Sequence, residues 1–448
     1  MIEKINIQNW KQFKDINIDF QNQVTILTGE NGTGKSSILK VLAKIIGWEF
    51  SEIRQPKPLS TEEIYLNQLI KKNKNIQSDE IKKEIKYRRK QIENIKNSEY
   101  MEKNVASLTI QSNDYDLISY ENQDSAEYTT TIRENRRIND NQNFRENHNY
   151  EYFTPLAGVF IPSHREPFMY SEVQSISSRF KSKQEIFNDY LTVFQGKQIS
   201  GRYYDSNDNP LNKFKAALIG LVIFSKQSND EGARAKKIIS DYELVLKKML
   251  PSSIRFESLN VSAGELLLNL KNDEKILLDS VSSGIGTILE LSWQILMTSP
   301  DDESEFIILI DEIENHLHPS LQREILPNLV EAFPNGQFIV ATHSPFVVNS
   351  VKNSITYGLT YNNEGKVTSM LLDFTNKFMN STEILKTILG VPVTMPIWAE
   401  DEIEKIIDKY TSKPINDTLY KELLSELSSL GYEDSMTKVL MELGRRAE

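Results

Sequence analysis

The chain of 448 residues contains no cysteine, and this absence excludes several kinds of chemistry. Disulfide bonds, thiolate zinc sites and cysteine nucleophiles are all impossible in a chain without thiols. Long apolar runs are also missing, because the longest one, 216–224, is far too short to cross a bilayer. Met1 leads directly into an alternating strand pattern and not into a cleavable signal peptide. We therefore expect a soluble cytoplasmic protein with no membrane partner.

Basic side chains are in the minority, with 52 Lys and Arg against 63 Asp and Glu. A generally basic surface for nucleic acid is not expected from this balance, so any contact with DNA would need a local patch. The length predicts a substantial core and two or three structural units.

A glycine-rich stretch, Gly29–Ser37 (GENGTGKSS), follows the apolar run 24–27 and precedes a helical pattern over 36–42. A strand, a glycine turn and a helix in this order are typical of the phosphate loop of P-loop NTPases. Glycines let main-chain amides curl around a polyphosphate, the lysine meets the terminal phosphates and the first serine holds Mg²⁺. A chance glycine turn is the weaker alternative. The predicted nucleotide-binding residues are Gly29, Asn31, Gly32, Thr33, Gly34, Lys35, Ser36 and Ser37.

A second apolar run, 306–310, ends in the acidic pair Asp311 and Glu312. Five apolar residues predict a strand buried on both faces, where carboxylates are costly unless they meet a cation or water. We expect Asp311 to act through Mg²⁺ together with Ser36, and Glu312 to polarise the attacking water as a general base. A further strand pattern, 336–341, leads to a lone histidine, His343. Its position at a strand end favours a functional histidine over a core one.

A serine and glycine turn, Val281–Gly284, precedes a helical pattern and lies about twenty residues before the apolar run 306–310. A hydroxyl and main-chain amides at a helix start suit a phosphate. Together with the N-terminal hairpin pattern over 2–20, these motifs resemble the ABC-type ATPase heads of the RecF, SMC and OLD group. The resemblance covers Gly29 to His343, roughly three quarters of the chain.

This resemblance implies an ATP- and Mg²⁺-dependent ATPase that works as a head-to-tail homodimer or a higher homo-oligomer. Ser282 and Gly284 would act on the γ-phosphate held by a second protomer, so each catalytic site would be composite. His343 would contact the γ-phosphate and sense its loss. The segment Glu314–Pro319, called here the dimer-facing loop, would lie at the contact between protomers.

The expected fold is an α/β ABC-type P-loop ATPase head with antiparallel N-terminal strands, a helical insertion and a C-terminal helical tail. We assign the head to 1–50, 105–165 and 253–375, helical insertions to 51–104 and 166–252, and a partner-docking tail to 376–448. In the tail, helices are predicted from 398, over 416–430 and over 436–443. Within the second insertion and after it, the patterns predict helices over 184–194, 211–224 and 233–250 and strands over 253–256, 265–270 and 276–278.

Several residues leave alternatives open. Lys11 and Phe13 would lie near the adenine by resemblance, but an aromatic packed under the sheet explains Phe13 equally well. The strand pattern 158–161 is followed by a turn that contains His164 and Arg165. These two residues fit either a functional site or, for Arg165, a structural salt bridge. His316 and His318 could suggest a metal site, but further ligands are missing nearby.

The sequence most resembles the ATPase subunits of the bacterial anti-phage systems Septu and PARIS. This resemblance implies a sensor and scaffold that restrains a separate effector, with a nuclease as the expected class. The alternative is a RecF-like DNA repair ATPase that clamps DNA through the basic segment 71–96, although a solvated helical hairpin is the more ordinary explanation of that segment. A transporter subunit is disfavoured, and an intrinsic nuclease is not expected because the single Asp-x-Asp pair, Asp114 and Asp116, lies outside the tail.

Overall fold

The computed structural model describes residues 1–48, 82–89, 107–112, 115–121, 128–134, 156–165, 170, 172–200, 209–372, 397–411, 417–430, 436, 439–440 and 443. The chain forms two compact units, Met1–Ile384 with Ile388–Gly390, and Leu385–Thr387 with Val391–Glu448. The predicted tail begins at 376, slightly before this boundary. The finer division into head segments and insertions stays a prediction.

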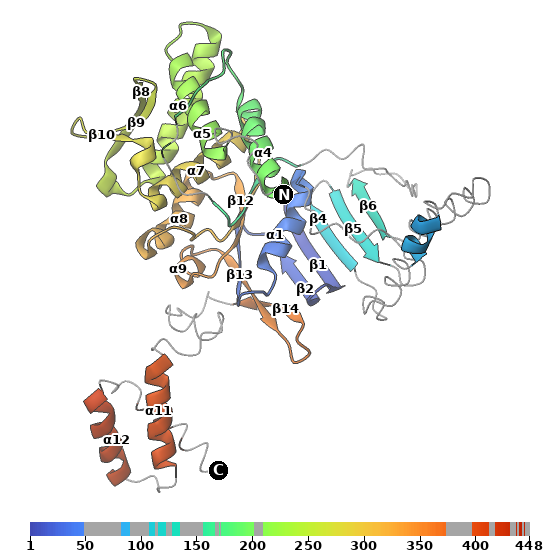
Figure 1. Ribbon diagram of the computed structural model, residues 1–448, viewed down its shortest axis with the longest axis vertical. Coiled ribbons are helices and arrows are strands. Elements are labelled where there is room, and N and C mark those ends of the chain that lie inside the picture. Colours follow the sequence, from blue (N-terminus) through green and yellow to red (C-terminus); the bar gives the residue numbers. More distant parts are fainter. Residues whose placement is uncertain are drawn as a thin grey trace. The chain divides into compact units, whose positions relative to one another are not determined.

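A mixed sheet organises the first unit (Figure 1). Its parallel half contains, in spatial order, β13 (Ile355–Tyr361), β3 (Val24–Gly29), β12 (Gly336–Ala341), β11 (Phe306–Asp311) and β7 (Gly158–Ile161). All residues of β3, β11 and β12 are buried, as their continuous apolar sequences predict. Because these strands are parallel, their carboxyl ends meet at one edge of the sheet.

The other half of the sheet is mainly antiparallel. From β13 it continues through β14 (Val367–Leu372), β2 (Phe13–Asp19), β1 (Ile2–Trp10), β4 (Ser107–Ser112), β5 (Tyr115–Glu121) and β6 (Tyr128–Glu134). Within it, β14 and β2 run parallel and the other pairs antiparallel. The expected α/β head with antiparallel N-terminal strands is therefore confirmed. The hairpin β13–β14 and the strand β6 were not predicted.

Helix α1 (Lys35–Ala43) follows the phosphate loop directly and packs across β3, β7, β11 and β12. Its buried side chains include Ile38, Leu39 and Leu42, which join the core formed by the isoleucines of β1 and β2. A short 3-10 helix, Lys44–Ile46, ends at Gly47, and Trp48 then meets Phe160 of β7 edge to face with 5.3 Å between ring centroids. The phosphate loop is thus anchored on both sides by apolar packing.

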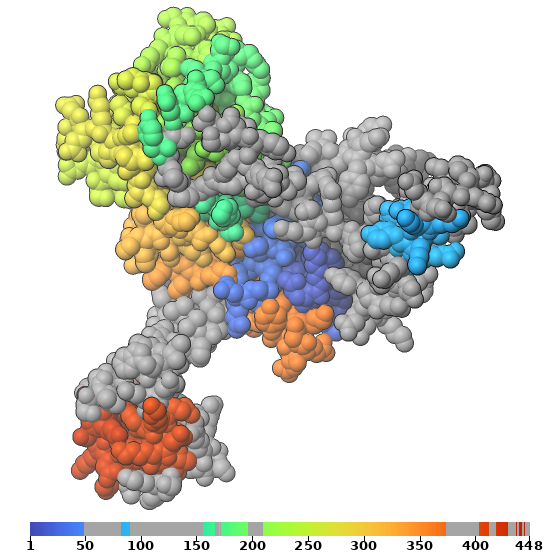
Figure 2. Space-filling view, in the orientation of Figure 1, coloured from blue at the N-terminus to red at the C-terminus, as the bar shows by residue number. Residues whose placement is uncertain are grey.

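Four helices form a second layer of the first unit, namely α4 (Lys183–Ser200), α5 (Pro210–Phe224), α6 (Asp230–Met249) and α7 (Ser283–Thr298). Trp293 of α7 is surrounded by the rings of Phe187, Tyr190 and Phe214. A small sheet of β8 (Phe256–Ser262), β9 (Glu265–Leu270) and β10 (Lys275–Leu277) packs through β8 and β9 on α5 and through β8 on α6. These parts form one continuous surface in Figure 2.

The prediction of a strand over 253–256 was wrong. Ser252–Ile254 form a 3-10 helix, and Arg255 turns the chain in the left-handed region with φ 54° before β8 begins. The predicted helices over 184–194, 211–224 and 233–250 correspond to α4, α5 and α6. Two further helices, α8 (Pro319–Ala332) and α9 (Pro345–Val348), follow the strands that carry the acidic pair and His343.

The second unit contains α11 (Ile397–Tyr410) and α12 (Asp417–Leu430), as predicted. Residues of both helices form a core of their own with Met436, Val439 and Leu443, which lie in the segment predicted as a third helix. In the described parts of both units, no helix is long and apolar enough to span a bilayer. Of the insertion 51–104, the structure describes a helix over 82–89.

A single buried amide joins the start of β12 to the N-terminal strands. Gln337 accepts a hydrogen bond from Ile2 N at 2.9 Å and donates to Ile2 O at 2.7 Å and Phe20 O at 2.9 Å. Gln337→Leu should lower the free energy of unfolding by about 3 kcal/mol, because three main-chain groups lose their partner inside the protein. Urea unfolding followed by circular dichroism measures this loss.

The matched control is Gln23→Leu. Gln23 is exposed and donates to Pro334 O at 2.7 Å, so water can replace the bond. Its substitution should cost less than about 1 kcal/mol. Equal losses in the two variants would contradict the role given to Gln337.

Candidate nucleotide site

The phosphate loop has the main-chain geometry that its glycines predict. Gly29 and Gly34 adopt φ of 143° and 88°, in the region that disfavours side chains. A Cβ on Gly29 would lie 2.3 Å from Leu359 O, and one on Gly34 would lie 2.5 Å from the ring of Phe13. The loop therefore needs glycine for close packing as well as for its turn.

Lys35 opens α1 and directs its ammonium group back into the loop. Its Nζ donates to Gly29 O at 3.0 Å and to Glu30 O at 2.8 Å. Burial lowers the pKa of Lys35 to about 8, while the carboxylates of Asp311, Glu312 and Glu314 act to raise it. These opposing effects place a cation, the three carboxylates and the phosphate loop within one electrostatic cluster.

Asp311 ends β11 inside this cluster and is only 3 % exposed. Burial raises the pKa of its carboxyl, and a hydrogen bond with the Ser36 hydroxyl acts to lower it. Among the described residues, its buried Oδ1 has no hydrogen-bond partner. An unpaired carboxylate oxygen beside a serine hydroxyl fits a hard divalent cation, so the donor set suits Mg²⁺.

Glu312 follows in a strained main-chain conformation with φ 48°. Its Oε2 accepts a hydrogen bond from Asn315 Nδ2 at 2.7 Å, and the same amide donates to Ser163 O at 2.9 Å. Arg165 donates from Nη2 to the main-chain oxygens of Asp311 at 3.0 Å and Glu312 at 3.2 Å. The side chain and main chain of Glu312 are thus held by different partners.

His343 lies beside the phosphate loop at the end of the neighbouring strand. Burial and the charge of Lys35 lower its pKa, while Glu312 and a hydrogen bond to the main chain of Gly29 act to raise it. Its main-chain N–H donates to Glu314 Oε1 at 2.6 Å, and the hydroxyl of Thr342 donates to Glu314 Oε2 at 2.8 Å. Glu314 therefore fixes the histidine segment to the dimer-facing loop.

Ser282 and Gly284 lie at the start of α7. Ser282 is exposed and caps the helix, with its Oγ accepting from Ile285 N at 3.5 Å. Gly284 is buried, and a Cβ there would lie 3.1 Å from His316 O of the dimer-facing loop. The segment Val281–Gly284, called here the signature segment, thus contacts the loop that carries Glu314 and Asn315.

With this geometry in view, comparison with known proteins gives a family. A model of the AAA ATPase domain matches residues 1–348. The chain belongs to this family. Among curated relatives, the Retron Vc95 probable ATPase of Vibrio cholerae serotype O1 biovar El Tor is 23 % identical over 92 % of this chain and 83 % of its own length. Septu protein PtuA of Bacillus thuringiensis is 27 % identical over 49 % of this chain and 60 % of its own.

The ATP/GTP phosphatase of Helicobacter pylori (strain ATCC 700392 / 26695) is 24 % identical over 77 % of this chain and 85 % of its own length. Among solved structures, the SMC head domain from Thermotoga maritima is 12 % identical and covers 83 % of this chain and 99 % of its own, with a TM-score of 0.40. The family assignment rests on the match of the AAA ATPase domain.

In this AAA-family ATPase, Lys11 and Phe13, the two residues expected near the adenine, have different surroundings. Phe13 is fully buried and stacks on Trp10 with 5.9 Å between ring centroids, so the packing explanation applies to it. Lys11 lies over the ring of Trp10 at 4.7 Å. The hydroxyl of Tyr361 lies 3.3 Å from the position of a Cβ on Gly32, which makes this half-exposed tyrosine a neighbour of the loop that the sequence did not suggest.

The two histidines of the dimer-facing loop have structural surroundings. His318 is the N-cap of α8, with Nδ1 accepting from Ser320 N at 3.3 Å, and His316 is exposed with φ 65°. No cluster of three potential metal ligands of the His, Cys, Asp and Glu types was found among the described residues. The residues that sequence reasoning missed are Glu314, Asn315 and Gln322, whose Oε1 accepts from the Ser344 hydroxyl at 2.6 Å. Only their place in the dimer-facing loop and α8 could have indicated them.

Glu314→Ala should lower kcat by about tenfold or more while changing KM little. The substitution removes the acceptor for Thr342 and His343 but leaves the phosphate loop intact, and small displacements of catalytic groups are costly. Steady-state phosphate release measures both constants. Glu324→Ala, at an exposed glutamate of α8, is the control and should behave as wild type. A normal kcat in folded Glu314→Ala would contradict the prediction.

Proposed function

We propose that this protein hydrolyses ATP with Mg²⁺ in composite sites formed between two copies of the chain. The observation that supports it best is the convergence of Lys35, Asp311, Glu312 and His343 at the carboxyl ends of three adjacent parallel strands. Catalysis of phosphoryl transfer depends on positioning and on charge stabilisation, and these residues supply both.

Each residue has a defined task in the proposed reaction. The phosphate-loop amides and Lys35 bind the polyphosphate, and Glu312 orients the attacking water and accepts its proton. Ser36 and Asp311 would hold Mg²⁺, which supplies positive charge to the phosphate oxygens when bound. His343, close to both Lys35 and Glu312, would contact the γ-phosphate.

A second copy is proposed because Ser282 stands exposed at a helix start. A hydroxyl and main-chain amides at such a helix end suit a phosphate that another protomer presents. Gly284 packs against the dimer-facing loop of its own chain, so engagement of the signature segment would act on Asn315 and Glu314. Binding of one nucleotide would thereby influence the other site.

Mixing two inactive variants tests the composite site. Lys35→Ala should lose nucleotide binding, and Ser282→Arg should block the contact with the partner's nucleotide. In an equal mixture, a heterodimer has one site with both Lys35 and Ser282 intact, so roughly a quarter of the wild-type rate should return. Unrestored activity in mixtures that do exchange subunits would show that each site lies within one chain.

We further propose that ATP acts as a switch that restrains a separate effector, with a nuclease as the expected class, in defence against phage. Two relatives named as a retron ATPase and a Septu protein support this proposal, and the retron match extends over most of the chain. The second unit, with a hydrophobic core of its own, is the proposed docking element.

A phage challenge tests the defence role. Cells that carry the gene with its native neighbours should resist phage, and Lys35→Ala in the same locus should abolish resistance without loss of the protein. Lys226→Ala, at an exposed lysine of the α5–α6 connection, should resist as wild type does. Plaque counts measure the outcome, and equal protection by Lys35→Ala would contradict a nucleotide-dependent role.

A RecF-like DNA clamp is the second candidate. The helix over 82–89 supports it, because five of its eight residues are Lys or Arg and one is Glu. Resistance to DNA damage that depends on Lys35, together with duplex binding that weakens steeply with salt, would favour this candidate over defence. The remainder of the basic segment 71–96 lies outside the described residues.

A further inference from the structure

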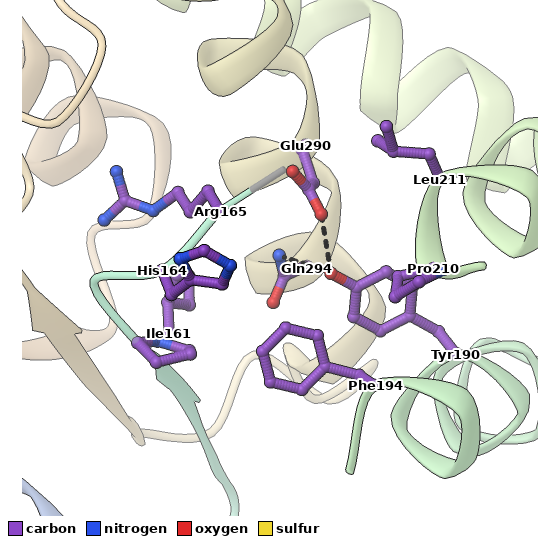
Figure 3. A pocket seen from close by; sticks show the side chains of 10 residues that line it. Ile161, His164, Arg165, Tyr190, Phe194, Pro210, Leu211, Glu290 and Gln294 are labelled. Atoms are coloured by element: carbon purple, nitrogen blue, oxygen red, sulfur yellow. Dashed lines mark hydrogen bonds between the residues drawn. The ribbon is translucent and has the colours of Figure 1, made fainter. Parts of the chain in front are cut away.

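Buried polar side chains of α4, of α7 and of the segment that follows β7 line one pocket (Figure 3). Tyr190 of α4 donates from its hydroxyl to Glu290 Oε1 at 2.6 Å, and Gln294 Nε2 donates to the same hydroxyl at 3.1 Å. Arg165, at the end of β7, reaches the main-chain oxygens of Asp311 and Glu312. All four side chains are at most 7 % exposed, and they line one pocket with His164.

Such an arrangement is costly, because buried charges lose their hydration. Among the described residues, Nε and Nη1 of Arg165 have no hydrogen-bond partner, and Nη2 donates to the two carbonyls. Burial lowers the pKa of Arg165, while Glu290, followed by Glu314, Asp311 and Glu312, acts to raise it. An apolar side chain would fill the same space at lower cost, which indicates that the guanidinium serves the acidic pair.

The position of these contacts indicates what the guanidinium does. Arg165 binds main-chain oxygens and leaves both carboxylates available for their own partners. Glu312 is held at φ 48°, a conformation that a non-glycine residue keeps only where neighbours enforce it. Glu290 belongs to α7, the helix that begins at the exposed Ser282.

We propose that Arg165 is a positioning residue that fixes the main chain of Asp311 and Glu312, and that Glu290 couples this setting to the signature helix α7. This proposal rests on the proposed hydrolysis in composite sites. When a partner's nucleotide engages Ser282, a displacement of α7 would move Glu290 relative to Arg165 and so change the direction of the Glu312 side chain.

Arg165→Lys tests the positioning role, because the lysine ammonium lies one bond nearer to the main chain than Nη2 of arginine and is a compact, strongly hydrated cation. We expect kcat to fall at least roughly tenfold, with KM and the affinity for a fluorescent ATP analogue changed by less than about threefold. Arg179→Lys is the matched control, since Arg179 is an exposed arginine before α4 that pairs with Glu185, and it should retain wild-type constants.

Two further measurements separate positioning from general stability. Arg165→Lys should lower the residual single-turnover rate of Glu312→Gln by a smaller factor than it lowers the wild-type rate, because one of the two groups that Arg165 positions is already lost. Glu290→Gln keeps the shape and the acceptor for Tyr190 but removes the charge, and it should lower kcat in the same direction with nucleotide affinity retained. It also tests the proposal if Arg165→Lys fails to fold.

A wild-type kcat in folded Arg165→Lys or in folded Glu290→Gln would overturn the proposal, as would a fully additive effect in the Glu312→Gln background. These outcomes differ from a failure of the proposed function. Absence of ATP turnover by the wild-type protein would refute hydrolysis itself, whereas turnover that is indifferent to Arg165 and Glu290 would refute only the coupling.

Discussion

Charged groups held out of water at one edge of the sheet are the constraint on which the rest of the structure depends. Lys35, Asp311, Arg165 and Glu290 are each at most 7 % exposed, and burial alone would neutralise or expel such groups. They are retained because each lies within the electrostatic reach of an opposite charge. The parallel order β3, β12, β11 and β7 provides this proximity, since it brings four chain segments to one edge.

The dimer-facing loop connects the parts of this arrangement. Glu314 binds the segment of His343, Asn315 binds the side chain of Glu312, and the main chain at His316 packs against Gly284. One loop therefore contacts Glu312, the main chain of His343 and the signature segment at Gly284. A loop with so many short contacts cannot move at one of them without disturbing the others.

Much of this could be predicted from the sequence, because the main features depend on local patterns. The phosphate loop, the buried strands that end in Asp311 and near His343, and the antiparallel N-terminal hairpin all follow from periodicity and glycine spacing. The contacts of Glu314 and Asn315 could not be predicted, since they depend on how a loop folds back between strands. Arg165 left two alternatives open, and only the approach of β7 to β11 shows that it reaches main-chain oxygens instead of a surface carboxylate. The segment 253–256 was mistaken for a strand because the single 3-10 turn that overlaps it, Ser252–Ile254, carries no periodic signal.

The core of the second unit has a consequence for how such a protein can diversify. Its buried residues pack on one another, among them Ile403, Leu423, Leu427 and Val439. The exposed faces of α11 and α12 are therefore not needed for this packing. Exposed positions such as Tyr420 and Leu424 can then change from lineage to lineage while the phosphate chemistry stays the same. Substitutions at these exposed positions would leave the buried core of the second unit unchanged.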